Sequence, residues 1–240
     1  MGISLQQIDK SDIAELVKVH TDAFKADQFS NFMLSGKPPG AHESLMERSL
    51  NAWFSDPTYW MVKAVNDDGA IVGWACWLTK AMDNTEKQVP SNATDTKETK
   101  GTSPPSETGP TTSSAETRDK SVSKPPPSQA ETPETPARIV GRQMRNDTMK
   151  WELDSMTENK YLVLQGLVTS PEYQCRGVGS QLINWGVERA DARQLPCWCH
   201  ASPAGNKLYL KAGFKELGSS EYDLGEFGRY TFRYMLRPVS

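Results

Sequence analysis

The chain has 240 residues, with 27 Lys and Arg against 30 Asp and Glu and a formal net charge of −3. Nine of the acids and six of the bases fall in residues 81–137, so the rest of the chain is neutral, with 21 of each sign. A neutral body lacks the basic surface that binds nucleic acid, and we expect no nucleic-acid partner. No apolar run approaches the roughly 18 residues of a membrane-spanning helix, so we expect no membrane association.

The four cysteines do not predict a metal site. Cys76, Cys175, Cys197 and Cys199 lack the paired spacing of a zinc motif. Cys197 and Cys199 form a C-x-C pair in an apolar strand, where both thiols would pack on one face. The start of the chain has no secretory signal pattern, and together these features predict reduced thiols and a cytoplasmic protein.

The first 80 residues predict a strand, two helices and a β-hairpin. The hairpin follows from two apolar β-prone runs separated by the turn-forming residues Asn66-Asp67-Asp68-Gly69. The predicted elements are a strand at 3–8, a helix that begins at Ser11 or Asp12, a second helix after a loop at 36–40, and strands at 60–65 and 70–78.

The composition changes between Ala81 and Ala137. This stretch holds 9 of the 16 prolines in the chain and no aromatic residue. Such a segment cannot bury enough apolar surface to offset the entropy lost on ordering. We therefore predict a disordered Pro/Ser/Thr-rich insertion at 81–137, with residues 1–80 and 138–240 as the two halves of one domain.

The second half predicts alternating helices and strands. The predicted elements are a helix at 138–155, strands at 161–169 and 195–201, a helix that runs from the glycines to about 191, a helix at 203–212, and closing strands at 214–218 and 230–237 around a polar loop at 219–228.

A glycine turn, Gln174-Cys175-Arg176-Gly177-Val178-Gly179-Ser180, joins the first of these strands to its helix. Free N–H groups at a helix start attract phosphate oxygens, and Gly177 and Gly179 carry no Cβ that would hold a ligand away. The turn therefore predicts a pyrophosphate site. The spacing excludes the dinucleotide motif G-x-G-x-x-G, whose third glycine would fall at Leu182, and it also excludes the P-loop. An ordinary glycine turn is the alternative.

The spacing Gln-x-x-Gly-x-Gly, after Leu167-x-Thr169-x-Pro171, resembles the acyl-CoA loop of the GNAT superfamily of N-acetyltransferases. Leu208-Tyr209 followed by Gly213-Phe214 is similar to a later helix of the same family. The resemblance implies an α/β GNAT fold: a mixed, mostly antiparallel sheet with central splayed parallel strands, flanked by helices. It also implies acetyl-CoA as co-substrate and direct attack by an amine, with a small-molecule amine as the expected acceptor.

The resemblance further implies the site residues. It places the two splayed strands at 162–169 and 196–202, with the pantetheine arm between them. The implied acetyl-CoA contacts are backbone groups of Leu167, Val168 and Thr169, the loop residues Gln174, Cys175, Arg176, Gly177, Val178, Gly179 and Ser180, and the Ser202 hydroxyl.

Two residues are the candidate proton carriers. Tyr209 is the implied general acid, because a phenol pKa lies close to that of an alkyl thiol. Packing on the sheet is its alternative role. His200 is the candidate base, since an ordinary histidine pKa suits proton uptake near neutrality. Related sequences often carry an acid at this place, so a satisfied buried histidine and a water chain stay open as alternatives.

The acceptor and the activity have alternatives as well. The resemblance makes the first helical pair one wall of the acceptor groove, with Phe29, Phe32, Met33 and Trp53 as candidate contacts or core residues. The neutral body argues against histone tails as acceptors. A protein N-terminal acetyltransferase and a catalytically inactive acyl-CoA-binding regulatory module remain as alternatives to a small-molecule enzyme. The sequence predicts no oligomeric state.

Overall fold

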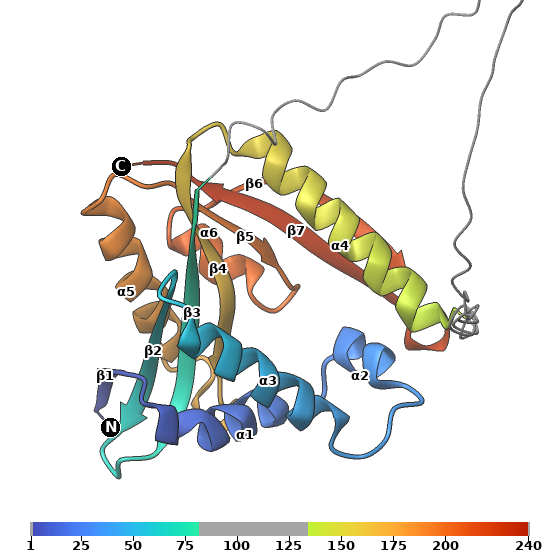
Figure 1. The fold of residues 1–240 in the computed structure, drawn as a ribbon, viewed down its shortest axis with the longest axis horizontal. Helices are drawn as coiled ribbons and strands as arrows, with labels where there is room; N and C mark the ends of the chain where they lie inside the picture. The colour runs from blue at the N-terminus through green and yellow to red at the C-terminus, as the bar shows by residue number, and fades with distance from the viewer. Residues whose placement is uncertain (1, 82–133, 240) are drawn as a thin grey trace, which may run out of the picture.

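The computed structural model of the protein describes residues 2–81 and 134–239 (Figure 1). Most of the predicted insertion lies outside the described residues. The elements are β1 (Ile3–Gln7), η1 (Lys10–Asp12), α1 (Ile13–Phe24), α2 (Gln28–Leu34), α3 (Ala41–Ser55), β2 (Tyr59–Asn66), β3 (Ile71–Ala81), α4 (Pro136–Ser155), β4 (Lys160–Thr169), η2 (Pro171–Tyr173), α5 (Val178–Asp191), β5 (Cys197–Ala201), α6 (Asn206–Lys211), β6 (Lys215–Asp223), η3 (Gly225–Phe227) and β7 (Arg229–Arg237).

The described strands form one seven-stranded sheet in the order β1-β2-β3-β4-β5-β7-β6. Every neighbouring pair is antiparallel except β4 and β5, which are parallel. The expected mixed, mostly antiparallel α/β sheet flanked by helices is therefore confirmed.

The central parallel pair is joined only at its start. Leu162 pairs with Cys197 and Val163 pairs with Trp198, and no later residue of β4 pairs with β5. A register shift against β3 leaves Gln165 as an extra residue in β4, two residues after the last of these pairs. A bulge of this kind bends its strand, which accounts for the divergence. We call the unpaired part of the two strands, beyond Val163 and Trp198, the splay.

The two faces of the sheet carry different helices. On one face α5 packs so closely on β3 that a Cβ on Gly186 would lie 2.0 Å from the Trp77 ring. On the other face Trp74 donates its indole N–H to the Leu16 carbonyl in α1 at 3.1 Å. The strand predicted at 70–78 is confirmed as part of β3, and it buries side chains on both of its faces. Both tryptophans are buried and belong to the core.

Helix α4 covers the C-terminal half of the sheet on the α1 face, lying along β7 and β6 (Figure 1). The Trp151 ring stacks on Tyr234 of β7 at 5.1 Å between centroids. Asp147 accepts a hydrogen bond of 2.8 Å from the Tyr222 hydroxyl of β6. The helix predicted at 138–155 is confirmed, and it begins at Pro136 behind a Thr135 cap.

The prediction was wrong in two details. The predicted polar loop at 219–228 is strand as far as Asp223, because β6 lies at the sheet edge and only one of its faces is covered. Its alternate residues, such as Glu221, are exposed and therefore polar. The prediction also omitted helix α2, which lies in a stretch that was assigned to no element, and Asp27 caps its first turn by accepting from the Ser30 amide at 2.8 Å. None of the helices within the described ranges has the length and apolar character that crossing a membrane requires.

The ends of the chain on either side of the insertion lie at opposite ends of α4. Ala81 pairs with Lys160, and the Lys80 amine binds the Glu152 carboxylate near the end of α4 at 2.6 Å. The helix begins 16 residues earlier, at Pro136, which is about 24 Å away along its axis. A connection between Ala81 and Pro136 must therefore span about this distance.

We predict that the length of a replacement for residues 82–133 decides whether the domain stays stable. A 20-residue Gly/Ser linker spans about 25 Å on average and should leave the free energy of unfolding within about 0.5 kcal/mol of the full chain. A linker of about five residues reaches at most about 17 Å, so the first turns of α4 would have to unwind. Urea unfolding of the two variants checks this, and equal stability would contradict the packing of α4.

Candidate functional site

The loop between β4 and α5 presents a row of free backbone amides, which we call the cradle (residues 175–180). The first backbone hydrogen bond of α5 is donated by Gln181 to the Gly177 carbonyl at 3.1 Å. No described residue accepts a hydrogen bond from the amides of Gly177, Val178, Gly179 or Ser180. Four amide donors at the positive end of a helix are suited to binding an anion such as pyrophosphate.

The backbone of the cradle is turned by two residues with positive φ. Cys175 has φ of 58° and Gly177 has φ of 86°. Conformations of this kind, alternating with ordinary ones, form the concave arrangement of N–H groups known as an anion-binding nest. At Gly177 the conformation favours glycine, and a Cβ there would meet no protein atom within 4 Å. Gly177 therefore shapes the open side of the cradle.

Gly179 has a different role from Gly177. A Cβ at this position would lie 3.1 Å from Leu208 and 3.7 Å from the Thr169 hydroxyl. It would face α6 and the end of β4. The absence of a side chain at Gly179 therefore permits α5 to approach α6 closely.

Three contacts hold the loop in place. The Gln174 side chain donates to the Thr169 carbonyl at 3.2 Å, and the Asn66 side chain donates to the Tyr173 hydroxyl at 2.8 Å. The Arg176 guanidinium lies over the Tyr173 ring, 5.5 Å from its centroid. Gln174, which was expected to contact the co-substrate, thus has a clear structural use in fixing the loop to the end of β4.

The end of β4 divides the three expected pantetheine contacts into two groups. The Ser170 amide donates to the Val72 carbonyl in β3 at 2.9 Å, and the Val168 carbonyl also faces β3, 2.7 Å from where a Gly73 Cβ would lie. Backbone groups alternate in direction along a strand. The backbone groups of Leu167 and Thr169 therefore point away from β3 and toward the splay, while those of Val168 face β3.

Tyr209 lies at the start of α6 with its ring against Gly205, where a Cβ would come within 2.7 Å of the ring. The ring is buried, next to Cys199 and Phe214. No described residue forms a hydrogen bond with its hydroxyl. Burial raises the pKa of this phenol, so Tyr209 carries its proton throughout the physiological range.

His200 lies on the opposite face of β5 from Tyr209. Its ring contacts Phe232 at 5.3 Å and Trp198 at 6.2 Å between centroids, on the side that α4 covers. Burial lowers the pKa of His200, which keeps the imidazole neutral near neutral pH. The two candidate proton carriers therefore do not touch, and they flank the end of β5 from the two sides of the sheet.

Ser202, directly after β5, belongs to a network that the sequence did not predict. The Tyr230 hydroxyl donates to the Asp27 carboxylate at 2.7 Å, and the Ser202 hydroxyl hydrogen-bonds the same tyrosine. The Gln28 side chain also donates to the Phe227 carbonyl at 2.7 Å. Helix α2 is thereby fastened to the C-terminal half of the sheet, beside the residue that was expected to contact the co-substrate.

The expected acceptor contacts lie in packed clusters. Phe29 contacts Tyr230 and Phe232, with centroids 5.4 and 5.1 Å apart. Phe32 is buried in the same cluster, and Met33 reaches Gly141 of α4. Trp53 belongs to a separate cluster, where its ring stacks on Tyr59. Core packing is the role that these contacts support.

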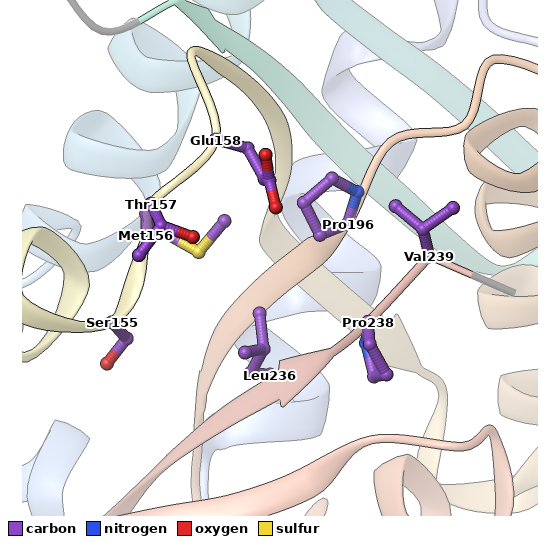
Figure 2. A pocket seen from close by; sticks show the side chains of 8 residues that line it. All are labelled: Ser155, Met156, Thr157, Glu158, Pro196, Leu236, Pro238 and Val239. Atoms are coloured by element: carbon purple, nitrogen blue, oxygen red, sulfur yellow. The ribbon is translucent and has the colours of Figure 1, made fainter.

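One surface cavity lies away from the splay. It holds about 270 Å³ and is lined mainly by the side chains labelled in Figure 2, including Pro196, Leu236, Pro238 and Val239. The Pro196 carbonyl accepts the Leu162 amide at 3.0 Å, at the start of β5. This cavity therefore sits at the joined end of β4 and β5 and contains none of the candidate residues.

A partly buried histidine borders the splay from the α1 side. His20 stacks on Phe24 at 4.5 Å and on Trp74 at 5.9 Å between centroids. The Trp74 ring in turn would lie 3.0 Å from a Cβ on Gly166 of β4. Burial, aided by the neighbouring His42, lowers the pKa of His20 to about 4.

The comparisons with known proteins agree on one family. The family model described as the acetyltransferase (GNAT) domain matches residues 140–216, from α4 through the cradle into β6. Arylalkylamine N-acetyltransferase 2 from Aedes aegypti superposes with a TM-score of 0.66 at 14% identity, over 100% of both chains. A histone acetyltransferase HPA2-related acetyltransferase from Corynebacterium glutamicum gives 0.58 at 18% identity, over 100% of this chain and 98% of that one.

The ribosomal-protein-S18-alanine N-acetyltransferase from Escherichia coli gives a TM-score of 0.51 at 13% identity, over 100% of this chain and 95% of that chain. At these identities the structural likeness shows the fold alone. A sequence search of curated proteins finds no match. Residues 140–216 thus match the model of the GNAT acetyltransferase domain, and the chain shares its fold with solved acetyltransferases.

We predict that burial of His20 makes the protein less stable in acid. The pKa of His20 is about 4 in the folded protein and near 6.5 when unfolded, so the unfolded chain binds more protons between these values. The contribution of His20 to stability is then constant above about pH 6.5 and falls by about 3 kcal/mol as the pH drops to about 4. Urea unfolding at several pH values measures the slope.

The variant His20→Phe keeps the aromatic stack and should lose about 2 kcal/mol of the stability difference between pH 7 and pH 5. His42→Gln removes only the smaller cause and should keep most of that difference. An unchanged slope in His20→Phe would show that His20 is not the group responsible.

Proposed function

We propose that the protein is an acetyl-CoA-dependent N-acetyltransferase that acetylates a small-molecule amine. The observation that carries the proposal is the splay in β4 and β5, with a cradle of free amides beyond the end of β4. A strand pair that stops pairing after two residues leaves backbone groups free for an extended ligand, and the cradle supplies donors for its phosphates.

Within this proposal, acetyl-CoA is held by backbone groups more than by side chains. Leu167 and Thr169 would pair with the pantetheine amides from the edge of β4, as a neighbouring strand would. The amides from Cys175 to Ser180 would bind the pyrophosphate, and Arg176 adds a positive charge beside them. Ser202 would lie across the splay, at the end of β5.

The bound co-substrate supplies a thioester whose carbonyl carbon an amine can attack directly. The new C–N bond forms as the C–S bond breaks, so one proton must leave the amine and one must reach the sulfur. His200 is neutral and can accept the first proton at a ring nitrogen. Tyr209 is protonated, and its free hydroxyl can donate the second. Their positions on opposite faces of β5 suit an amine and a thiol that sit on opposite sides of the reacting carbon.

The acceptor class separates the leading proposal from its alternatives. The neutral body of the protein supports a small acceptor over a basic protein tail. The structural relatives include enzymes named for an arylalkylamine and for a ribosomal-protein alanine, so both classes belong in the assay. Acetyl transfer from acetyl-CoA over a panel of arylalkylamines, polyamines and N-terminal peptides tests the proposal. Binding of acetyl-CoA with no transfer to any acceptor would favour a regulatory module.

We predict that Gly177→Ala weakens acetyl-CoA binding by at least roughly tenfold, which is about 1.4 kcal/mol. The new Cβ would stand on the open side of the cradle, and alanine disfavours the left-handed backbone conformation found there. Calorimetric titration with acetyl-CoA measures the affinity. Gly69→Ala is the matched control, because Gly69 also has a positive φ and open space but lies in the β2–β3 turn. Wild-type affinity in Gly177→Ala would remove the cradle from the proposal.

We predict that Tyr209→Phe lowers kcat by roughly 10²–10⁴-fold, because it removes a general acid and keeps the packed ring. Acetyl-CoA affinity and melting temperature should hardly change, since no described residue bonds the lost hydroxyl. The loss should shrink with an acyl donor whose thiol leaves as a more stable anion. Full activity in Tyr209→Phe, together with unfolding of Tyr209→Ala, would assign this residue to packing alone.

A further inference from the structure

Glu152 is a buried carboxylate that the proposed reaction does not yet use. It is 7% exposed and is the only charged side chain in the buried class among the described residues. The Lys80 amine binds it at 2.6 Å and the Tyr161 hydroxyl donates to it at 2.9 Å. Removing a carboxylate from water is costly, and a buried ion pair often adds less stability than apolar residues of the same volume. The burial of this charge therefore points to a use other than stability.

The position of Glu152 places its charge in the same layer as His200. Its partner Tyr161 comes just before the two β4 residues that pair with β5, and clusters with Trp198 between the sheet and α4. His200 is the next residue on this face of β5, with its ring 6.2 Å from the Trp198 ring. Aromatic rings fill the layer, and in such a low-dielectric setting a charge acts over a longer distance than in water.

The other ionisable groups around His200 are weaker candidates for this effect. Tyr234 is its register partner on β7, and Asp147 of α4 is bound to the Tyr222 hydroxyl. Lys80 offsets part of the Glu152 charge but stands 39% exposed. Glu152 acts to raise the pKa of His200, while burial, the larger effect, lowers it.

Resting on the proposed function, we propose that Glu152 is a positioning residue for the transfer reaction. Its fixed negative charge stabilises the imidazolium that forms when a ring nitrogen of His200 takes the proton lost by the acceptor amine. The amine N–H bond breaks and an imidazole N–H bond forms, and no group is oxidised or reduced. Helix α4, which follows the insertion, thus supplies a part of the proton-accepting machinery on β5.

Two substitutions at this position separate charge from shape. Glu152→Gln keeps the shape and an acceptor for Tyr161 but removes the charge. Glu152→Asp keeps the charge but shortens the side chain and weakens both of its contacts. If Glu152 only stabilises the fold, Glu152→Asp should lower transfer activity more than Glu152→Gln. The proposal predicts that Glu152→Gln causes the larger loss of activity.

The first measurement is NMR titration of the histidine rings in the full chain, with His200 assigned by substitution among the three histidines. We expect the pKa of His200 to fall in Glu152→Gln and to stay near the wild-type value in Glu152→Asp. Asp147→Asn, on the same helix, is the control and should leave the titration unchanged. No shift in Glu152→Gln would overturn the proposal without bearing on acetyl transfer, because this measurement needs no substrate.

The second measurement is the pH dependence of kcat/KM with an acceptor from the panel. The acid-side limb should move to lower pH in Glu152→Gln, and kcat should fall by roughly tenfold at most, since the base is weakened and still present. Glu152→Asp should restore the wild-type profile. If the pKa of His200 falls in Glu152→Gln but the acid-side limb of the kcat/KM profile does not move, Glu152 has no role in proton transfer. Measurable transfer in every variant would still leave the acetyltransferase proposal standing.

Discussion

The structure depends on a parallel strand pair that is joined by only two residue pairs. Val163 and Trp198 form the last of these, and the extra residue Gln165, two residues further along β4, bends the strand away. Parallel pairing past this point would close the sheet and leave no edge for a ligand. The rest of the molecule has to hold two partly separated half-sheets at a fixed distance, and the packing of α4, α5 and α2 serves that requirement.

Each of these helices holds the half-sheets together in a different way. On one face helix α5 packs a glycine against Trp77 of β3, and its Asp191 carboxylate pairs with Arg237 of β7 at 2.6 Å. Helix α4 reaches from Tyr222 on the edge strand to Tyr161 on β4 across the other face. Helix α2 follows α1 in the chain, yet its Asp27 and Gln28 bond to residues of the last hairpin. These contacts make the width of the splay a property of the whole domain.

The sequence predicted the features that are encoded locally. The cradle could be located because its glycines and its helix start fall within seven consecutive residues, and β3 because an apolar run follows the turn-forming residues 66–69. Partners distant in the chain were not predictable. Asp27 and Tyr230 are 203 residues apart, Lys80 and Glu152 are 72 apart, and no local pattern marks either pair. The outer part of β6 was missed because an edge strand with one open face has the composition of a loop. The splay itself was expected only through the family resemblance.

The position of the insertion suggests that the chain need not be covalently continuous there. It separates β3 from β4, which are neighbours joined by nine residue pairs, from Gly73 with Thr169 to Ala81 with Lys160. The segment before it contributes α2, which packs on the β6–β7 hairpin. The segment after it contributes β4 and α5, which pack against β1, β2 and β3. A chain cleaved between the two segments would therefore be expected to remain a single folded particle. The same two segments, produced as separate polypeptides, form a natural fragment-complementation pair, because β3 in one piece pairs with β4 in the other.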